Sequence, residues 1–71
     1  MNNNFLTKSE LVFDTLKKRI IDGELEPGTE LVISRISEEF NVSTIPVREA
    51  IKTLASEGLV EIEPHKSAKV A

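Results

Sequence analysis

The fold of this chain is decided by the stretch Val42-Ser43-Thr44-Ile45-Pro46-Val47-Arg48-Glu49-Ala50-Ile51-Lys52-Thr53-Leu54. Apolar residues recur there at the three- and four-residue spacing of an amphipathic helix, at positions 47, 50, 51, 54 and 55. Ser43 is the predicted N-cap, and Pro46 falls at the third helical position, where no intrahelical N–H bond is required. Gly58 is expected to end the helix.

The polar face of this helix carries Thr44, Arg48 and Lys52, each four residues after the last, so their side chains form one line on the helix surface. An arginine can donate two hydrogen bonds to a guanine, and a lysine can reach a guanine or a phosphate. Backbone N–H groups of Ser43 and Thr44 can bind a phosphate at the helix start. Spacing alone favours a DNA-reading helix and an ordinary solvated face about equally.

Two further helices and a short β-prone run are predicted upstream. Apolar periodicity indicates a helix over about 9–22, with Ser9 as its N-cap. A shorter helix over about 35–40 is expected after Ser34, its predicted cap. The run 31–33 is too short to stand alone as a strand, so it needs a partner strand elsewhere in the chain.

Downstream, residues 59–63 and 68–70 are predicted to pair as an antiparallel hairpin. Residues 1–8 lack periodicity and are interpreted as a flexible N-terminal arm, which leaves 9–71 as the domain. The expected fold is mainly α with a small β-hairpin. Its order of helix, short strand, helix, helix and two-stranded wing is that of a winged helix-turn-helix.

Cations occupy two further places that suit DNA contact. His65 and Lys66 lie at the predicted hairpin tip, which can follow a DNA backbone or enter a minor groove, although His65 is as readily an ordinary exposed loop residue. Arg35 opens the second helix, where the first helix of such a motif crosses the backbone. A surface ion pair with Glu38 or Glu39 is the plain alternative for Arg35.

Composition narrows the class of protein. The 71 residues hold no Cys and one His, so neither a disulfide scaffold nor a structural metal site is expected, and no cofactor is predicted. No apolar run could span a bilayer, and no secretory signal is present, so we expect a cytoplasmic protein that is not an enzyme. The net charge of −3 opposes DNA binding, but the acidic excess lies in the first 40 residues.

The sequence resembles the GntR family of bacterial transcription regulators from about residue 10 to residue 71. The segment 24–31 is similar to the family's G-x-L-x-P-G-x-x-L, and 42–54 is similar to V-S-R-T-P-V-R-E-A-L-R-R-L. Residues 57–60 match the family's E-G-L-V helix exit, and 64–71 resemble the wing of its FadR-like branch.

The resemblance implies a winged helix-turn-helix that binds double-stranded operator DNA as part of a homodimer, with the isolated domain associating weakly. It implies DNA contact at positions that this chain fills with Arg35, Ser43, Arg48 and His65. It also implies a metabolite-responsive regulator with a helical C-terminal effector domain. That domain is missing from these 71 residues, so the chain is interpreted as cut at a domain boundary.

Three positions depart from the family pattern: Thr44 stands where the family has Arg, Ile45 where it has Thr, and Ser67 where it has the wing glycine. One DNA-binding cation is therefore missing, and the family's usual operator is not carried over. A winged-helix protein-interaction module without DNA binding is the alternative function, which the acidic net charge favours. DNA binding requires Arg35, Arg48, Lys52, His65 and Lys66 to gather on one side, away from the acids.

Overall fold

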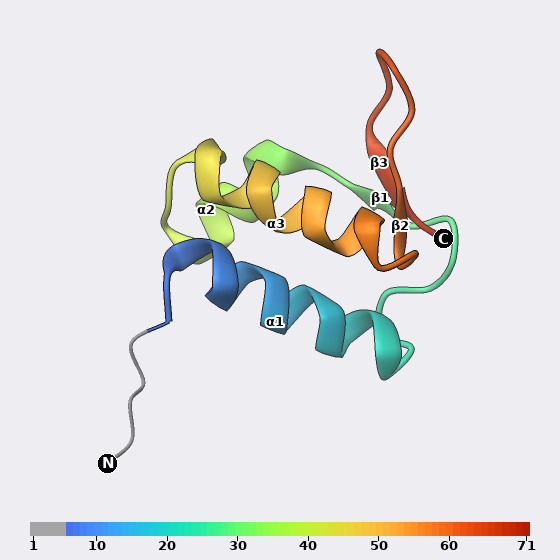
Figure 1. Cartoon of the computed structure of the whole chain (residues 1–71), viewed down its shortest axis with the longest axis horizontal. Helices are drawn as coiled ribbons and strands as arrows, with labels where there is room; N and C mark the ends of the chain where they lie inside the picture. Colours follow the sequence, from blue (N-terminus) through green and yellow to red (C-terminus); the bar gives the residue numbers. More distant parts are fainter. Residues whose placement is uncertain (1–5) are drawn as a thin grey trace.

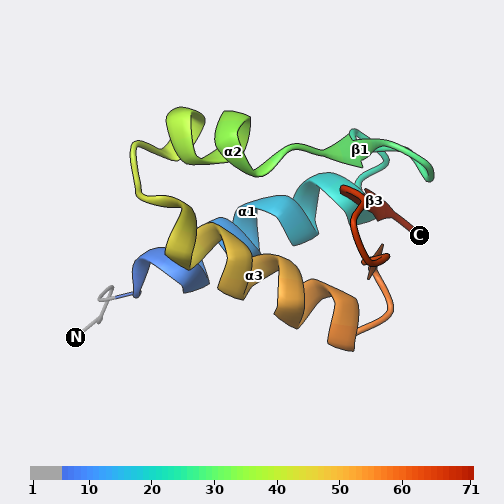
Figure 2. The same ribbon diagram turned by 90° about the horizontal axis from the view of Figure 1, so that it is seen from above.

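The computed structural model describes residues 6–71 of the chain. Three helices, α1 (Lys8–Ile21), α2 (Ile33–Phe40) and α3 (Thr44–Ser56), are combined with three short strands, β1 (Glu30–Leu31), β2 (Val60–Glu61) and β3 (Ala68–Val70). Helices α1 and α3 lie side by side, and the β2–β3 hairpin stands out at the end where α3 stops (Figure 1). In the perpendicular view, α2 and β1 lie along one side and α3 along the other (Figure 2). The predicted winged helix-turn-helix is confirmed.

The core is built from one face of each element. Every buried side chain among residues 6–71 is apolar, and the four largest that are fully buried are Leu16, Leu54, Val12 and Val47. The apolar stripe predicted for α3 is buried at 47, 50, 51 and 54, and the residue at 55 is half-buried. Each large side chain of this kind contributes about 1.5–3 kcal/mol on burial, so α3 is fixed firmly with its opposite face outward.

Helix α1 begins earlier than its sequence pattern predicts. Its N-cap is Thr7, not Ser9. The Thr7 hydroxyl accepts a hydrogen bond from the backbone N–H of Glu10 at 3.0 Å, while the Glu10 carboxylate accepts one from the N–H of Thr7 at 2.8 Å. This reciprocal capping box satisfies two free N–H groups at once, which Ser9 could not do. Residues 1–5 of the predicted arm, which was expected to cover 1–8, lie outside the described residues. Thr7 and Lys8 belong to the start of α1.

Helix α2 also begins earlier, and the strand before it is shorter than expected. The backbone carbonyl of Val32 accepts hydrogen bonds from the N–H groups of Arg35 and Ile36, both at 3.1 Å, so the helix begins at Ile33. Val32 is the N-cap and provides no side-chain bond, so the prediction that Ser34 caps this helix is wrong. The strand β1 ends at Leu31 because its ladder with β3 ends there.

The strand β3 is the middle of a three-stranded antiparallel sheet with the order β1-β3-β2. Leu31 lies opposite Ala68 and Val60 lies opposite Val70, so β3 is the partner that the short upstream run needed. The strand β2 covers only Val60–Glu61 of the predicted 59–63, while β3 matches its predicted bounds. The sheet anchors the wing beside the end of α3.

The helix α3 ends at the predicted glycine. Gly58 has φ +79°, and its N–H donates to Ala55 at 3.0 Å while the N–H of Leu59 donates to Leu54 at 3.0 Å. These two bonds form a Schellman motif, which favours a residue without Cβ at this left-handed position. The chain therefore turns sharply from α3 into β2, and this turn places the wing.

Candidate nucleic-acid interface

The exposed face of α3 carries the predicted line of polar side chains. Thr44, Arg48 and Lys52 are all exposed, whereas the apolar stripe of the same helix is buried. Ser43 is the N-cap as predicted, but its side chain makes no capping hydrogen bond. Its hydroxyl and the first N–H groups of α3 are therefore available to an outside acceptor such as a phosphate.

Three of the predicted cations line one groove of about 540 Å³ between α3, the start of α2 and the wing. Arg48 and Lys52 come from α3, and Lys66 comes from the wing tip. The groove is also lined by apolar residues, namely Leu31, Val32, Ile33, Ile51, Ile62 and Ala68. Ser34 and Ser67 also line it. An elongated polyanion can therefore meet cations on both sides of the same groove.

Arg35 and His65, the other two residues predicted to contact DNA from outside α3, do not line this groove. Arg35 lines a smaller hollow together with Arg19 and Glu39. His65 lines a hollow on the wing that also contains Glu63 and Lys69. The groove therefore joins three of the five residues that were expected to gather on one side.

The wing tip has an unusual backbone conformation at His65. The N–H of Lys66 donates to the carbonyl of Glu63 at 3.2 Å, which closes a four-residue turn with Pro64 and His65 at its centre. His65 has φ +61° at the second central position, where a type II turn normally has Gly or Asn. A left-handed residue with a Cβ costs about 1–2 kcal/mol, so the turn presents the imidazole at the expense of some local strain.

Ion pairing separates Lys17, Lys18 and Arg19 of α1 from the cations of α3. Lys17 pairs with Glu57 at 3.1 Å, and Lys18 pairs with Asp22 at 2.7 Å. Within residues 6–71, neither Arg48 nor Lys52 takes part in an ion pair. The α3 cations are therefore free to bind an external anion.

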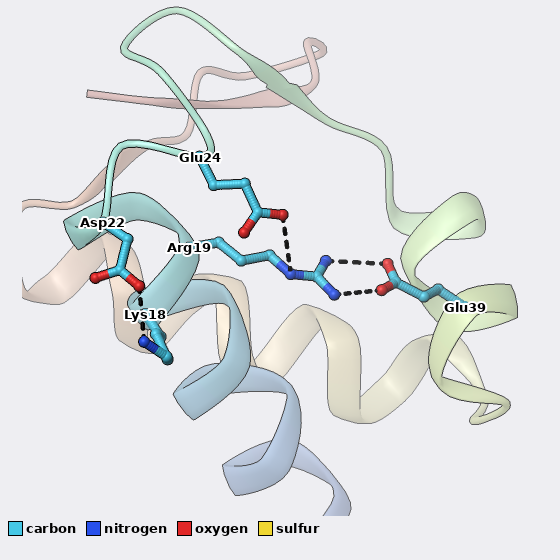
Figure 3. Close-up of polar contacts among 5 residues, drawn as sticks. All are labelled: Lys18, Arg19, Asp22, Glu24 and Glu39. Carbon is cyan, nitrogen blue, oxygen red and sulfur yellow. Dashed lines mark hydrogen bonds and ion pairs between the residues drawn. The ribbon is translucent and has the colours of Figure 1, made fainter.

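Arg19 is the centre of the largest ion-pair cluster among residues 6–71. Its guanidinium donates to both carboxylate oxygens of Glu39, with Nη1 to Oε1 at 3.1 Å, and its Nε lies 3.9 Å from the carboxylate of Glu24 (Figure 3). The guanidinium also lies 5.8 Å from the ring centroid of Phe40. These contacts join α1 to α2, so Arg19 is engaged in contacts between elements of the fold.

These contacts shift the titration of the groups involved. The hydrogen bond from Arg19 lowers the pKa of the Glu39 carboxyl below its ordinary value, against the opposing effect of partial burial. The hydrogen bond to Glu39 raises the pKa of the Arg19 guanidinium. The hydrogen bond to Asp22 likewise raises the pKa of the Lys18 ammonium. The plain alternative for Arg35, a pair with Glu38 or Glu39, does not form in the described part of the chain, where the Glu39 carboxylate is held by Arg19.

Apart from Arg48, Lys52 and Lys66, the residues that line the groove were not predicted as site residues, and Ser34, Ser67 and Ile62 are examples. Ser34 was interpreted as a helix cap, Ser67 only as a departure from the family pattern, and Ile62 as a strand residue. The alternation of Ile62 with Glu61 and Glu63 was the available signal, because it places Ile62 on the opposite side of the hairpin from the acids. No sequence pattern predicts that Ser34 lines the groove, because its place in the fold depends on where the strand β1 ends.

Two structural findings concern other kinds of site. Over residues 6–71, no three His, Asp or Glu side chains converge as metal ligands do. The described helices are all too short or too polar to cross a membrane.

Comparisons with known proteins agree with this geometry. Residues 8–70 match the family described as bacterial regulatory proteins, gntR family. The gluconate operon transcriptional repressor of Bacillus subtilis is 50% identical over 48 residues, which are 68% of this chain and 20% of the repressor. The chain therefore spans about a fifth of the length of that relative.

Solved structures show the same likeness. A GntR-family transcriptional regulator from Pseudomonas syringae pv. tomato superposes with a TM-score of 0.84 and 39% identity, over 90% of this chain and 27% of the other. AraR(DBD) in complex with operator ORX1 superposes with a TM-score of 0.89 and 25% identity, over 100% of this chain and 87% of the other. The chain belongs to the gntR family of bacterial regulatory proteins, and it is a winged helix-turn-helix DNA-binding domain of that family.

Proposed function

We propose that this domain reads double-stranded operator DNA by placing the start of α3 in the major groove, with the wing against the adjacent backbone. The observation that carries the proposal is the groove that Arg48, Lys52 and Lys66 line together. Arg48 and Lys52 are exposed, unpaired among residues 6–71 and in line, and Lys66 faces the same groove from the wing. These are the positions from which a helix-turn-helix contacts bases and phosphates.

Each side chain has a distinct role in this proposal. Arg48 donates to a guanine edge, and Lys52, one turn further from the helix start, contacts a phosphate. Thr44 and Ser43 bind the backbone at the helix start, where Ser43 has no competing cap bond. At the flanks, Arg35, His65 and Lys66 contact phosphates or the minor groove.

The complete regulator is proposed to be a cytoplasmic, metabolite-responsive homodimer of the FadR-like branch that performs no catalysis. The resemblance of the wing sequence 64–71 to that branch supports the finer assignment. Two domains held in a dimer bind two half-sites, and the second site is bound at high effective concentration once the first is held. The isolated domain, by contrast, is expected to be largely monomeric at micromolar concentration and to bind one half-site weakly.

A selection from randomised duplexes tests the proposal. The 71-residue chain should enrich a defined half-site, and its binding should weaken with salt at a slope of about −3 to −4, as expected for three or four phosphate contacts. The Arg48→Ala/Lys52→Ala variant should lose most of this binding. The Lys17→Ala/Lys18→Ala variant removes the same charge from α1 and should retain it. Equal losses in both variants, or no enrichment, would favour a protein-interaction module instead.

A further inference from the structure

The most exposed large apolar side chain among residues 6–71 lies on the proposed reading helix. Ile45 is 66% exposed and belongs to the first turn of α3. It makes no part of the buried core or of the half-buried residues packed against it. The fold therefore gives no reason for an isoleucine at this position.

Its position on the helix places Ile45 beside the proposed base-reading arginine. Ile45 and Arg48 are three residues apart, and side chains at this spacing are neighbours on a helix surface. Ile45 is also next to Thr44 at the helix start, the end that enters the major groove most deeply. An apolar side chain there loses its water when DNA binds.

The C5-methyl group of thymine is the apolar group that proteins contact on base edges in the major groove. From the exposure of Ile45 and its place beside Arg48, we infer that Ile45 is a specificity-determining residue that contacts a thymine methyl within one base pair of the guanine bound by Arg48. This inference rests on the proposed function and adds a second base to it. Arg48 selects by hydrogen bonds, and Ile45 selects by methyl contact.

The test removes the methyl group from the DNA and the side chain from the protein, separately and together. In the selected half-site, each thymine in turn is replaced by deoxyuridine, which keeps every hydrogen-bonding group. One replacement should weaken binding of the unaltered chain about fourfold, the ratio expected for one buried methyl group. For Ile45→Ala, the same replacement should have no effect, while Ile45→Val should keep most of the response.

Ile21 provides the matched control. It is 64% exposed and lies at the last position of α1. Ile21→Ala should leave both affinity and the deoxyuridine response unchanged. Equal deoxyuridine effects on the unaltered chain and on Ile45→Ala, or no responsive thymine in the half-site, would overturn the inference while DNA binding stands. No binding to any duplex would overturn the proposed function itself.

Discussion

Three cations of α1, Lys17, Lys18 and Arg19, have the same charge as the cations of α3 but opposite surroundings. Lys18 and Arg19 are bound to carboxylates within the fold, whereas Arg48 and Lys52 face the groove unpaired within residues 6–71. The acids that pair with α1 are counted in the net charge of −3, yet they are already neutralised locally. Net charge alone therefore misjudges this domain, because the distribution of ion pairs decides which cations can meet DNA.

Loss of Arg48 should have the largest effect on DNA binding. Arg48→Ala removes the only arginine on the exposed line of α3, so specific binding should weaken by about 1–3 kcal/mol and preference should relax at one base pair. Binding to the selected half-site and to its single-base variants measures both effects. Lys18→Ala removes one charge from α1 and serves as the control. An unchanged preference profile for Arg48→Ala would show that Arg48 touches only phosphate or solvent.

Loss of Arg19 should act on stability instead. Its side chain is 27% exposed, forms two hydrogen bonds to Glu39 and lies over Phe40, so Arg19→Ala should lower the free energy of unfolding by about 1–2 kcal/mol. The midpoint temperature should then fall by roughly 4–8 °C per kcal/mol. Affinity for DNA per folded molecule should stay the same. A clear loss of affinity in fully folded Arg19→Ala would remove the distinction between the two regions.

The pH dependence of stability should also show the contribution of the pair between Arg19 and Glu39. Because the pKa of Glu39 is lowered in the folded state, its pair with Arg19 stabilises fully above the ordinary value of 4.5 and is lost as the pH falls through the lower folded value. With Glu39 about half exposed, this contribution is under about 1 kcal/mol. Thermal unfolding between about pH 6 and 3 should show a smaller drop for Arg19→Ala than for the unaltered chain.

Loss of Lys52 should change salt dependence more than specificity. If Lys52 contacts one phosphate, Lys52→Ala weakens binding to all duplexes alike and reduces the salt slope by about one unit. Titrations at several salt concentrations, with a selected and an unrelated duplex, measure this. Altered base preference with the slope intact would mean that Lys52 reads a base.

The sequence predicted what local periodicity and caps determine. The buried stripe of α3, its stop at Gly58 and the pairing of β3 all followed from residue spacing. The Thr7–Glu10 capping box is present in the sequence as a T-x-x-E pattern, which identifies Thr7 as the N-cap. The start of α2 was not predictable, because it depends on where the β1–β3 ladder ends.

The groove was predictable only in part. Four-residue spacing identified Arg48 and Lys52, since that spacing fixes a shared helix face. The pair between Arg19 and Glu39 joins residues 20 positions apart, and no local pattern reports it. Because this pair cannot be recognised in the sequence, the sequence does not show which cations are neutralised.

Lys66 shares a feature with each group of cations: it lines the groove, and it is also close to a carboxylate. The variant that tests it has the smallest predicted effect. Lys66 lines the groove with Arg48, yet its ammonium lies 3.8 Å from the carboxylate of Glu63 at the same wing tip. Glu63→Gln should free this cation and remove a negative charge close to the DNA, so binding should tighten about two- to threefold at low salt. Glu24→Gln, which removes an acid from the Arg19 cluster instead, should leave binding unchanged. If both variants tighten binding equally, the domain responds to its total charge, and the separation between paired and unpaired cations has no bearing on DNA.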